Sequence, residues 1–278
     1  RALMMDQLEI KQLEASNQFS AILDTDGNVY LWGNPSITDL ECRNAERETE
    51  GMDHAPRKYQ GNIEKIALTS NTYISLLKDG TVAYTGLKGD SPLAGNLPKE
   101  LTNGSVKVVD IAASSQAAAA VDETGKVWIW GVATHGEKNV PEMSAKPVKL
   151  YGGRYHFTAL LENGDVVSWG DNMYGQADVP ESVQNDQIAD LFCGGYQNYV
   201  ITSDGDIDTW GLKGFLCGTD EQGRDLLSRI VNGGKTTMTV GGIAVVIATI
   251  IGVVLGGLAG YFGGKTDIIL SRVAEVLG

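Results

Sequence analysis

The sequence predicts a mainly β protein: a β-propeller of about five four-stranded blades, followed by a C-terminal α-helical transmembrane segment. Three observations lead to this prediction. One strand pattern recurs five times, every copy has a glycine turn between two apolar runs, and 25 residues near the end carry no charge. We divide the chain into a propeller at 1–211, an amphipathic pre-membrane segment at 212–237, a membrane helix at 238–262 and the start of another helix at 263–278.

A repeat of about forty residues organises the first part of the chain. Each copy reads as an apolar strand, a polar break, a second strand, a turn and a third strand that ends in glycine. The terminal glycines are Gly33, Gly86, Gly131, Gly170 and Gly211. The turns are Asp26-Gly27, Asp79-Gly80, Thr124-Gly125, Asn163-Gly164 and Asp204-Gly205. Such turns predict hairpins, and small sheets that cannot bury their faces alone must pack side by side, as in a propeller.

Four copies carry a tryptophan just before the terminal glycine. These residues are Trp32, Trp130, Trp169 and Trp210. Because they recur at one place in the repeat, we predict that they pack in the core rather than stack on a ligand. Thr85 replaces the tryptophan in the second copy, and the connection before that copy carries the charged stretch ITDLECRNAERETE. This second blade is therefore predicted to be irregular.

The repeats resemble those of the regulator of chromosome condensation family over about 8–211, and WGDNMYGQADVPESV resembles its bacterial branch. The resemblance implies a propeller, usually of seven blades, whereas five copies are counted here. Either this propeller is smaller, in which case a C-terminal strand that completes the first blade would close the ring, or further blades lie upstream. The loop residues Met173, Tyr174 and Gln176 either contact a partner or pack within the repeat.

The charge is unevenly distributed along the 278 residues. Lys and Arg number 22 and Asp and Glu 35, for a net charge of −13. Residues 212–278 hold 6 basic and 5 acidic side chains, which leaves 16 and 30, or −14, for the propeller. Such an acidic surface does not neutralise nucleic-acid phosphates, so no nucleic-acid partner is expected. It also disfavours guanine-nucleotide exchange of the kind performed by nuclear relatives of the repeat family.

Several patterns suggest catalysis or metal binding but lack a required residue. GGKTT at Gly233 and GGKTD at Gly263 are not P-loops, because Arg229 and Ala259 stand where a glycine is needed. The stretch that starts at Asp24 resembles a calcium loop, but a proline replaces the glutamate at its twelfth position. We therefore expect a hairpin turn at this place.

The histidines and cysteines show no ligand spacing either. They are His54, His135, His156, Cys42, Cys193 and Cys217. The three histidines lie far apart, and the three cysteines include no Cys-x-x-Cys pair, which favours buried free thiols. We expect no catalytic residue, no metal site and no cofactor in this chain, and hence no enzyme.

Residues 238–262 read MTVGGIAVVIATIIGVVLGGLAGYF and predict a transmembrane helix. At about 1.5 Å per residue the span reaches about 37 Å, somewhat more than a hydrocarbon core of about 30 Å, so some tilt is expected. Gly252, Gly256 and Gly260 recur every four residues on one helix face. Small residues in this arrangement let another helix approach closely, which predicts helix packing.

The flanks of this span resemble the permease subunits of dipeptide, oligopeptide and nickel ABC importers over about 215–278. The matching residues before the span are Gly218, Thr219, Asp220, Gly223, Arg224, Asp225, Ser228 and Arg229, and GYFGG at 260–264 matches after it. The resemblance implies that 238–262 is the family's second membrane helix and that 263–278 begins the next one. It also implies that the preceding propeller lies outside a bacterial cell, inserted between the first two helices.

The same resemblance implies the partners: a second permease subunit, ATPase subunits that hold the ATP, and an external substrate-binding protein. In this interpretation the chain is a fragment of a permease, and the propeller binds a partner or the substrate. Arg224 and Arg229 then anchor the segment at the membrane interface or contact neighbouring subunits. The alternative is a surface binding or adhesion module that uses the helix only as a membrane anchor.

Overall fold

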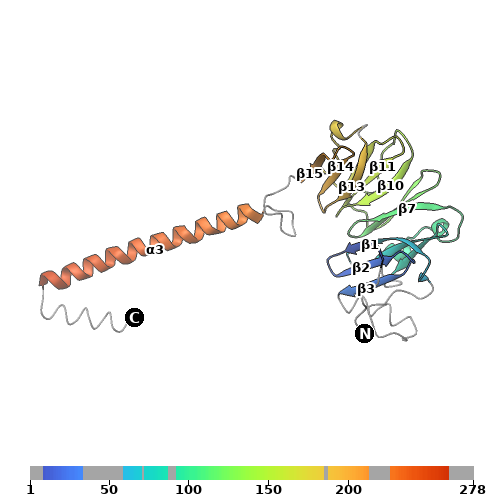
Figure 1. Cartoon of the computed structure of the whole chain (residues 1–278). Coiled ribbons are helices and arrows are strands. Elements are labelled where there is room, and N and C mark those ends of the chain that lie inside the picture. The colour runs from blue at the N-terminus through green and yellow to red at the C-terminus, as the bar shows by residue number, and fades with distance from the viewer. Residues whose placement is uncertain are drawn as a thin grey trace, which may run out of the picture. The chain divides into compact units, whose positions relative to one another are not determined.

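A computed structural model describes most of the chain (Figure 1). The described residues are 9–33, 59–70, 72–86, 92–184, 187–212 and 226–262. The chain forms two compact units, Arg1–Lys213 and Gly214–Gly278. Cys42, His54, Cys217 and residues 263–278 lie outside the described residues.

The first unit contains five antiparallel sheets of three strands each. In chain order these are β1 (Ile10–Ala15), β2 (Phe19–Asp24) and β3 (Val29–Gly33); β4 (Ile63–Leu68), β5 (Tyr73–Leu77) and β6 (Val82–Thr85); β7 (Val108–Ala113), β8 (Ala117–Asp122) and β9 (Val127–Gly131); β10 (Pro147–Gly152), β11 (His156–Leu161) and β12 (Val166–Gly170); β13 (Ile188–Cys193), β14 (Gln197–Thr202) and β15 (Ile207–Gly211). The sheets follow one another around an arc, from β1–β3 to β13–β15 (Figure 1). This arrangement is a propeller-type fold, as the repeat predicted.

The number of strands in each blade differs from the prediction, because the described residues show three per sheet rather than four. The third strand of one sheet and the first strand of the next are joined by irregular connections where the structure describes them. After β12 the connection contains turns and a short 3-10 helix at Glu181–Val183, and before β7 the connection contains α2 (Pro92–Gly95) and a 3-10 helix at Lys99–Leu101. Pro180 and Pro98 precede the two 3-10 helices, and proline cannot donate the hydrogen bond that a ladder needs.

In four of the five repeats the final glycine is required by a close approach of the backbone. Gly170 has φ +106°, and a Cβ atom there would lie 2.6 Å from the carbonyl oxygen of Tyr155. A Cβ atom on Gly131 would likewise lie 2.6 Å from the carbonyl oxygen of Gln116. A larger residue would therefore strain the backbone and push the third strand away from the turn between the first two.

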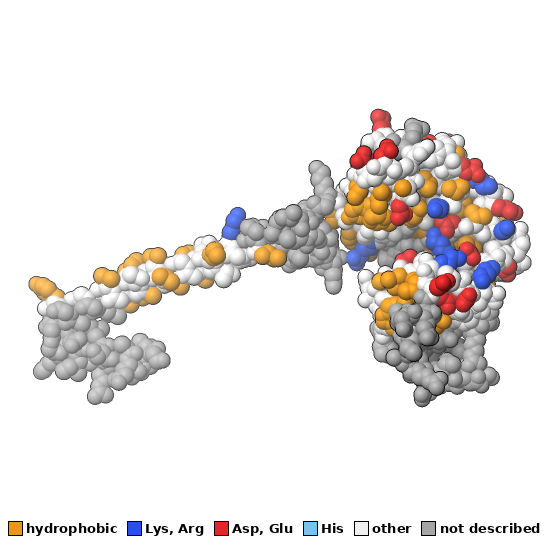
Figure 2. All heavy atoms as spheres, viewed as in Figure 1, with side chains coloured by type: hydrophobic (Ala, Val, Ile, Leu, Met, Phe, Trp, Pro, Cys, Tyr) orange, Lys and Arg blue, Asp and Glu red, His pale blue; other side chains and the backbone are white. Residues whose placement is uncertain are grey.

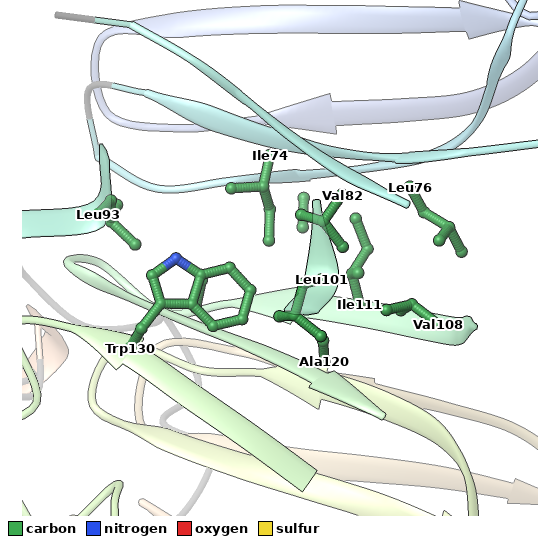
Figure 3. Packing of buried hydrophobic residues seen from close by; sticks show 11 residues of the cluster. Ile74, Leu76, Val82, Leu93, Leu101, Val108, Ile111, Ala120 and Trp130 are labelled. Atoms are coloured by element: carbon green, nitrogen blue, oxygen red, sulfur yellow. The ribbon is translucent and has the colours of Figure 1, made fainter. Parts of the chain in front are cut away.

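The core is divided into clusters, each of which lies between two consecutive sheets. Figure 3 shows the cluster between the second and third sheets, where Trp130 and Ile111 face Ile74, Leu76 and Val82. Three further clusters join the first sheet to the second, the third to the fourth and the fourth to the fifth. Neighbouring sheets therefore stabilise one another.

The tryptophan prediction is confirmed at three of its four positions. Trp130, Trp169 and Trp210 are buried in these clusters, whereas Trp32 is only half-buried. Thr85, which replaces the tryptophan in the second copy, is buried as well. The strands of that copy pair as in the other sheets, so the predicted irregularity is not found in them.

Hydrogen bonds join consecutive sheets near the axis of the arc. We call the first strand of each sheet, which lies nearest to this axis, the innermost strand, and the turn that follows it the axial turn. The bonds lie at these axial turns. The Ser70 amide donates to the Ser115 carbonyl at 3.0 Å, the Ser115 amide to the Arg154 carbonyl at 3.1 Å, and the Arg154 amide to the Gly195 carbonyl at 2.8 Å. The Ser16 hydroxyl donates to the Ser70 carbonyl at 3.3 Å. These bonds fix the spacing of consecutive sheets.

The second unit contains the helix α3, Leu226–Phe262, which is 37 residues long. It starts inside the segment that was predicted to precede the membrane. Its stretch Gly233–Val254 is long and apolar enough to cross a bilayer by length and composition, with a mean hydropathy of 2.3. Hydrophobic side chains lie along the described helix in Figure 2. Open space surrounds Gly252, and the surroundings of Gly256 and Gly260 lie outside the description.

Ile111→Ala should destabilise the propeller, because Ile111 is fully buried between the second and third sheets. The expected loss is about 2–5 kcal/mol of unfolding free energy. Val109→Ala, on the exposed face of the same strand, is the control and should cost about 0.5 kcal/mol or less. Denaturant unfolding followed by tryptophan fluorescence measures both, and equal losses would contradict the proposed core.

Candidate binding surface

A cavity of about 480 Å³ lies where the five innermost strands meet. It is lined by strand residues such as Gln12, Glu14 and Lys65 and by the axial turns, which contribute Arg154. The repeat explains this arrangement, because every copy places its first strand at the edge of its sheet and the same turn after it. The axial end of the fold is thus a polar hollow to which every sheet contributes.

Several charged and polar side chains in and near this cavity hold the sheets together. The Lys65 ammonium lies 2.7 Å from Asp110 Oδ1, and Asp110 Oδ2 accepts the Leu150 amide at 2.7 Å. The Gln12 side chain accepts the Ile66 amide at 2.9 Å and donates to the Ile66 carbonyl at 2.7 Å. These contacts give the three side chains a structural role.

Beside the cavity lies a group of ring side chains with one guanidinium, which we call the aromatic strip. It consists of His135, Arg154, Tyr155, Tyr174 and Tyr196. His135 stacks on Tyr155 with ring centroids 4.0 Å apart, and Tyr174 meets Tyr196 edge-on at 5.2 Å. Arg154 Cζ lies 5.7 Å from the centroids of both Tyr155 and Tyr196. The strip therefore joins the fourth and fifth sheets by ring contacts and cation–π contacts.

The loops that carry the strip are held by buried side chains. Glu137 accepts the His135 amide at 2.7 Å, and Gln176 accepts the Tyr174 amide at 2.8 Å. The carbonyl of Glu137 accepts the Trp169 indole N–H at 2.8 Å, and the carbonyl of Gln176 accepts the Trp210 indole N–H at 3.1 Å. The strip is thus preorganised by the repeat core.

Among the loop residues considered from the sequence, Tyr174 belongs to the strip and Met173 beside it is exposed, whereas Gln176 is buried and supports the loop. Sequence reasoning missed Arg154, Tyr155 and Tyr196. Their signal was available, because the two tyrosines follow the axial glycine-rich turn at equivalent positions of the fourth and fifth repeats.

A buried polar cluster lies behind the strip, between the same two sheets. The side-chain oxygen of Asn198 accepts hydrogen bonds from Thr158 at 3.0 Å and from Cys193 at 2.9 Å, and it lies 2.9 Å from His156 Nε2. Burial lowers the pKa of His156, although Asn198 and the charge of Asp171 oppose this shift. Burial raises the pKa of the Cys193 thiol to about 12. The raised pKa keeps the Cys193 thiol protonated at neutral pH.

The residues of the permease motif cannot be placed as a site. Gly218, Thr219, Asp220, Gly223, Arg224 and Asp225 lie outside the described residues. Ser228 and Arg229 belong to the first turn of α3, but their side chains are also outside the description. Within the described part of the chain, no group of three or more His, Cys, Asp or Glu side chains is arranged to hold a metal ion.

Comparison with known proteins agrees with the propeller-type fold. The sequence pattern of the Regulator of chromosome condensation (RCC1) repeat matches residues 148–176. The structure of yeast RCC1 (Prp20) bound to Kap60 is similar with a TM-score of 0.57 and 20% identity, over 79% of this chain and 60% of that one. The CRINKLY WD40 ectodomain of the Arabidopsis thaliana receptor kinase ACR4 gives 0.53 and 18%, over 76% and 66%. The propeller is thus RCC1-like in fold.

A second set of relatives matches a short stretch. The dipeptide transport system permease protein DppC of Bacillus subtilis is 48% identical over 60 residues, which are 22% of this chain and 19% of that protein. The oligopeptide transport system permease protein OppC of Haemophilus influenzae is 45% identical over 60 residues, with the same shares. The chain thus spans about a fifth of the length of these relatives. It combines an RCC1-like propeller with a stretch similar to peptide permeases.

The His156 cluster predicts a pH dependence of stability. The folded pKa lies below the ordinary value of 6.5, so the unfolded chain binds more protons as the pH falls through 6.5. The contribution of His156 to the unfolding free energy should therefore be constant above this pH and should decrease as the pH falls below it. His156→Gln, which copies Gln197 at the equivalent place of the next repeat, should flatten the decrease, whereas His135→Gln should retain it. Urea unfolding from about pH 7.5 to about pH 5.5 tests this, and identical slopes in both variants would contradict it.

Proposed function

We propose that the chain belongs to a permease subunit of a bacterial peptide-class ABC importer, with the propeller outside the cell. The observation that supports this most strongly is the 48% identity to a dipeptide permease over 60 residues. The motif residues before the apolar span account for a match of this kind, and α3 supplies a helix long enough to cross the membrane. The second permease subunit and the ATP-bearing ATPases would be separate partners.

The order of the segments supports an external propeller. The propeller comes first, the motif follows, and α3 comes next. If α3 is the second membrane helix of the permease, its leading motif faces the outside, and so does whatever is inserted before it. Basic residues flank both ends of the span, so the positive-inside rule gives no independent orientation.

The propeller would then capture the solute, or the binding protein that delivers it, before transport. The aromatic strip has suitable chemistry, because a guanidinium between two tyrosine rings binds a carboxylate through charge-assisted hydrogen bonds while the rings cover apolar groups. A short peptide offers a terminal carboxylate and side chains of this kind. The backbone of Arg154 is held between neighbouring sheets, because its carbonyl accepts the Ser115 amide and its own amide donates to the Gly195 carbonyl.

A membrane-anchored binding module is the second candidate. It needs only a helix that crosses the membrane, and the stretch Gly233–Val254 of α3 is long and apolar enough for that. The two candidates differ in one respect: an anchored module does not need the permease partners. Co-purification of the ATPase subunits with the tagged chain from its native membrane separates them.

Uptake of a labelled dipeptide tests the capture role. Replacing residues 8–211 by a short flexible linker in the complete permease should reduce uptake at low dipeptide concentration while the importer still assembles. Arg154→Gln should weaken binding of the same peptide to the propeller by about tenfold, the loss of about 1.4 kcal/mol from a charged hydrogen bond. A matched control is Lys138→Gln, an exposed cation on a neighbouring loop.

Two results would contradict this account. Unchanged uptake after removal of the propeller would exclude the capture role while leaving the permease assignment intact. The side of the membrane is tested with Lys138→Cys in a chain whose native cysteines have been replaced. If the propeller lies outside, this exposed cysteine should react on intact cells with a maleimide that cannot cross the membrane. Protection of that cysteine until the cells are opened would place the propeller inside.

Packing of α3 against other permease helices gives a further test. Gly252→Leu and Gly256→Leu should weaken helix association by about 1 kcal/mol each, because the larger side chains keep the partner helix at a distance. Gly257→Leu is the control, since this residue lies on another face of the helix. Energy transfer between labelled helices in lipid vesicles measures association, and equal effects at all three positions would exclude a packing face.

A further inference from the structure

The outer strand of each sheet has one row of backbone N–H and C=O groups that its own sheet does not pair. In the first sheet a side-chain amide meets this row: the Val29 amide donates to Gln60 Oε1 at 2.9 Å, and Gln60 Nε2 donates to the Val29 carbonyl at 3.0 Å. Gln184 makes the same two bonds with Val166 in the fourth sheet, at 3.0 and 2.8 Å. Two repeats therefore hold a carboxamide group on the same backbone position.

Val82 is the equivalent residue of the second sheet. All three valines stand two places after the glycine of the hairpin turn and begin the outer strand. In the second hairpin the Leu77 amide donates to the Thr81 carbonyl at 2.9 Å, and Leu76 faces Val82 in the register. Because inward and outward bonds alternate along a strand, Val82 turns its N–H and C=O groups away from β5. Among the described residues, neither group has a hydrogen-bond partner.

These two backbone groups belong to a buried residue. Val82 is 3% exposed, and Figure 3 shows its side chain in the cluster between the second and third sheets. Buried backbone N–H and C=O groups are nearly always hydrogen-bonded, because losing water without gaining a partner costs free energy. The equivalent Val127 of the third sheet is only half-buried, so solvent can serve as its partner. Val82 therefore combines burial with an edge that no side-chain amide of the described residues meets.

A cavity of about 410 Å³ borders this edge. It lies between β6, which contributes Val82 and Tyr84, and the connection to the third sheet, which contributes Ala94 and Leu97. The helix α2 of this connection packs on β9 of the third sheet. The lining side chains are mostly apolar or aromatic, and the volume falls in the range of small-molecule pockets, about 300–1,000 Å³. A small ligand in this cavity would lie against the edge at Val82.

The two glutamines show which chemistry fits this edge. A carboxamide offers an acceptor and a donor to the N–H and C=O of one backbone residue. One residue of an extended peptide offers the same pair, because facing residues of an antiparallel ladder exchange both hydrogen bonds. When a peptide is added to a sheet edge, its main chain provides affinity and its alternate side chains enter pockets. A short extended peptide thus matches both the edge and the apolar cavity.

We propose that the cavity beside β6 binds a short extended peptide, which pairs with Val82 through the N–H and C=O of one of its residues. The peptide's apolar side chains lie against Tyr84 and Leu97. The inference rests on continuity with two interfaces of the same chain, in which Gln60 and Gln184 occupy the equivalent place. It goes beyond the capture role of Arg154, because pairing uses the main chain of the ligand and needs no terminal carboxylate.

Hydrogen exchange at Val82 tests the pairing directly. The full chain in lipid nanodiscs is mixed with N-acetyl-Val-Ala-Val-amide, a probe whose capped ends offer no carboxylate to Arg154. At a probe concentration about ten times its Kd, exchange of the Val82 amide should slow about tenfold, measured by mass spectrometry with fragmentation to single residues. The amides of Val29 and Val166, which already have a side-chain partner, are the controls within the same chain and should not change.

Two sets of variants test the geometry. N-methylation of the probe residue that pairs with Val82 should weaken binding about tenfold, whereas N-methylation of the adjacent residue, whose N–H points away from the edge, should have little effect. Ala94→Phe fills the cavity and should also weaken binding about tenfold. The matched control is Asn96→Phe, an exposed residue of the same connection. Arg154→Gln should leave binding of the capped probe unchanged, so this site and the capture role can fail separately.

Three outcomes would overturn the proposal. Unchanged exchange at Val82 with the probe at millimolar concentration would show that the edge accepts no peptide. Equal weakening by N-methylation at every probe residue would show binding without strand pairing. A parent chain that dimerises in light scattering, and that the probe returns to the monomer, would identify β6 of a second copy as the occupant.

Discussion

The fold depends on one contact that is repeated from sheet to sheet: from the second sheet onward, an apolar residue of the first strand is buried against the preceding sheet. Backbone hydrogen bonds between the axial turns accompany this contact and set the spacing. Because no sheet of three strands buries both of its faces alone, stability must accumulate along the arc. The exposed Leu13 at one end and Ile207 at the other follow from the same rule.

The candidate binding surface is a product of this stacking. Arg154 takes part in the axial hydrogen bonds with its backbone and reaches the tyrosines of two repeats with its side chain. The loops beside it are held by Glu137 and Gln176, whose carbonyls bind the core tryptophans. Binding chemistry and repeat packing are therefore coupled through the same few residues.

The fold could be predicted from the sequence because its signals are local. Turn glycines, alternating strands and recurring tryptophans are each visible within one copy. The repeat also marks Tyr155 and Tyr196 as equivalent residues, but the contacts of the aromatic strip could not be predicted in this way, because they join different repeats and depend on the angle between sheets. The number of strands per blade differs from the prediction because the sequence pattern marks only three strands in each copy, and the fourth was expected from the usual blade of a propeller. Trp32 differs from its equivalents because of its place in the arc.

The two parts of the chain differ in charge, apolar content and relatives, and the proposal made above is that a capture domain is joined to a permease helix. An electron cryomicroscopy map of the protein purified with its native partners from the membrane tests this claim most directly. The account predicts α3 among the helices of a two-subunit permease, with the propeller on the side opposite the ATPases. A map with α3 alone in lipid, or with the propeller on the ATPase side, would contradict it.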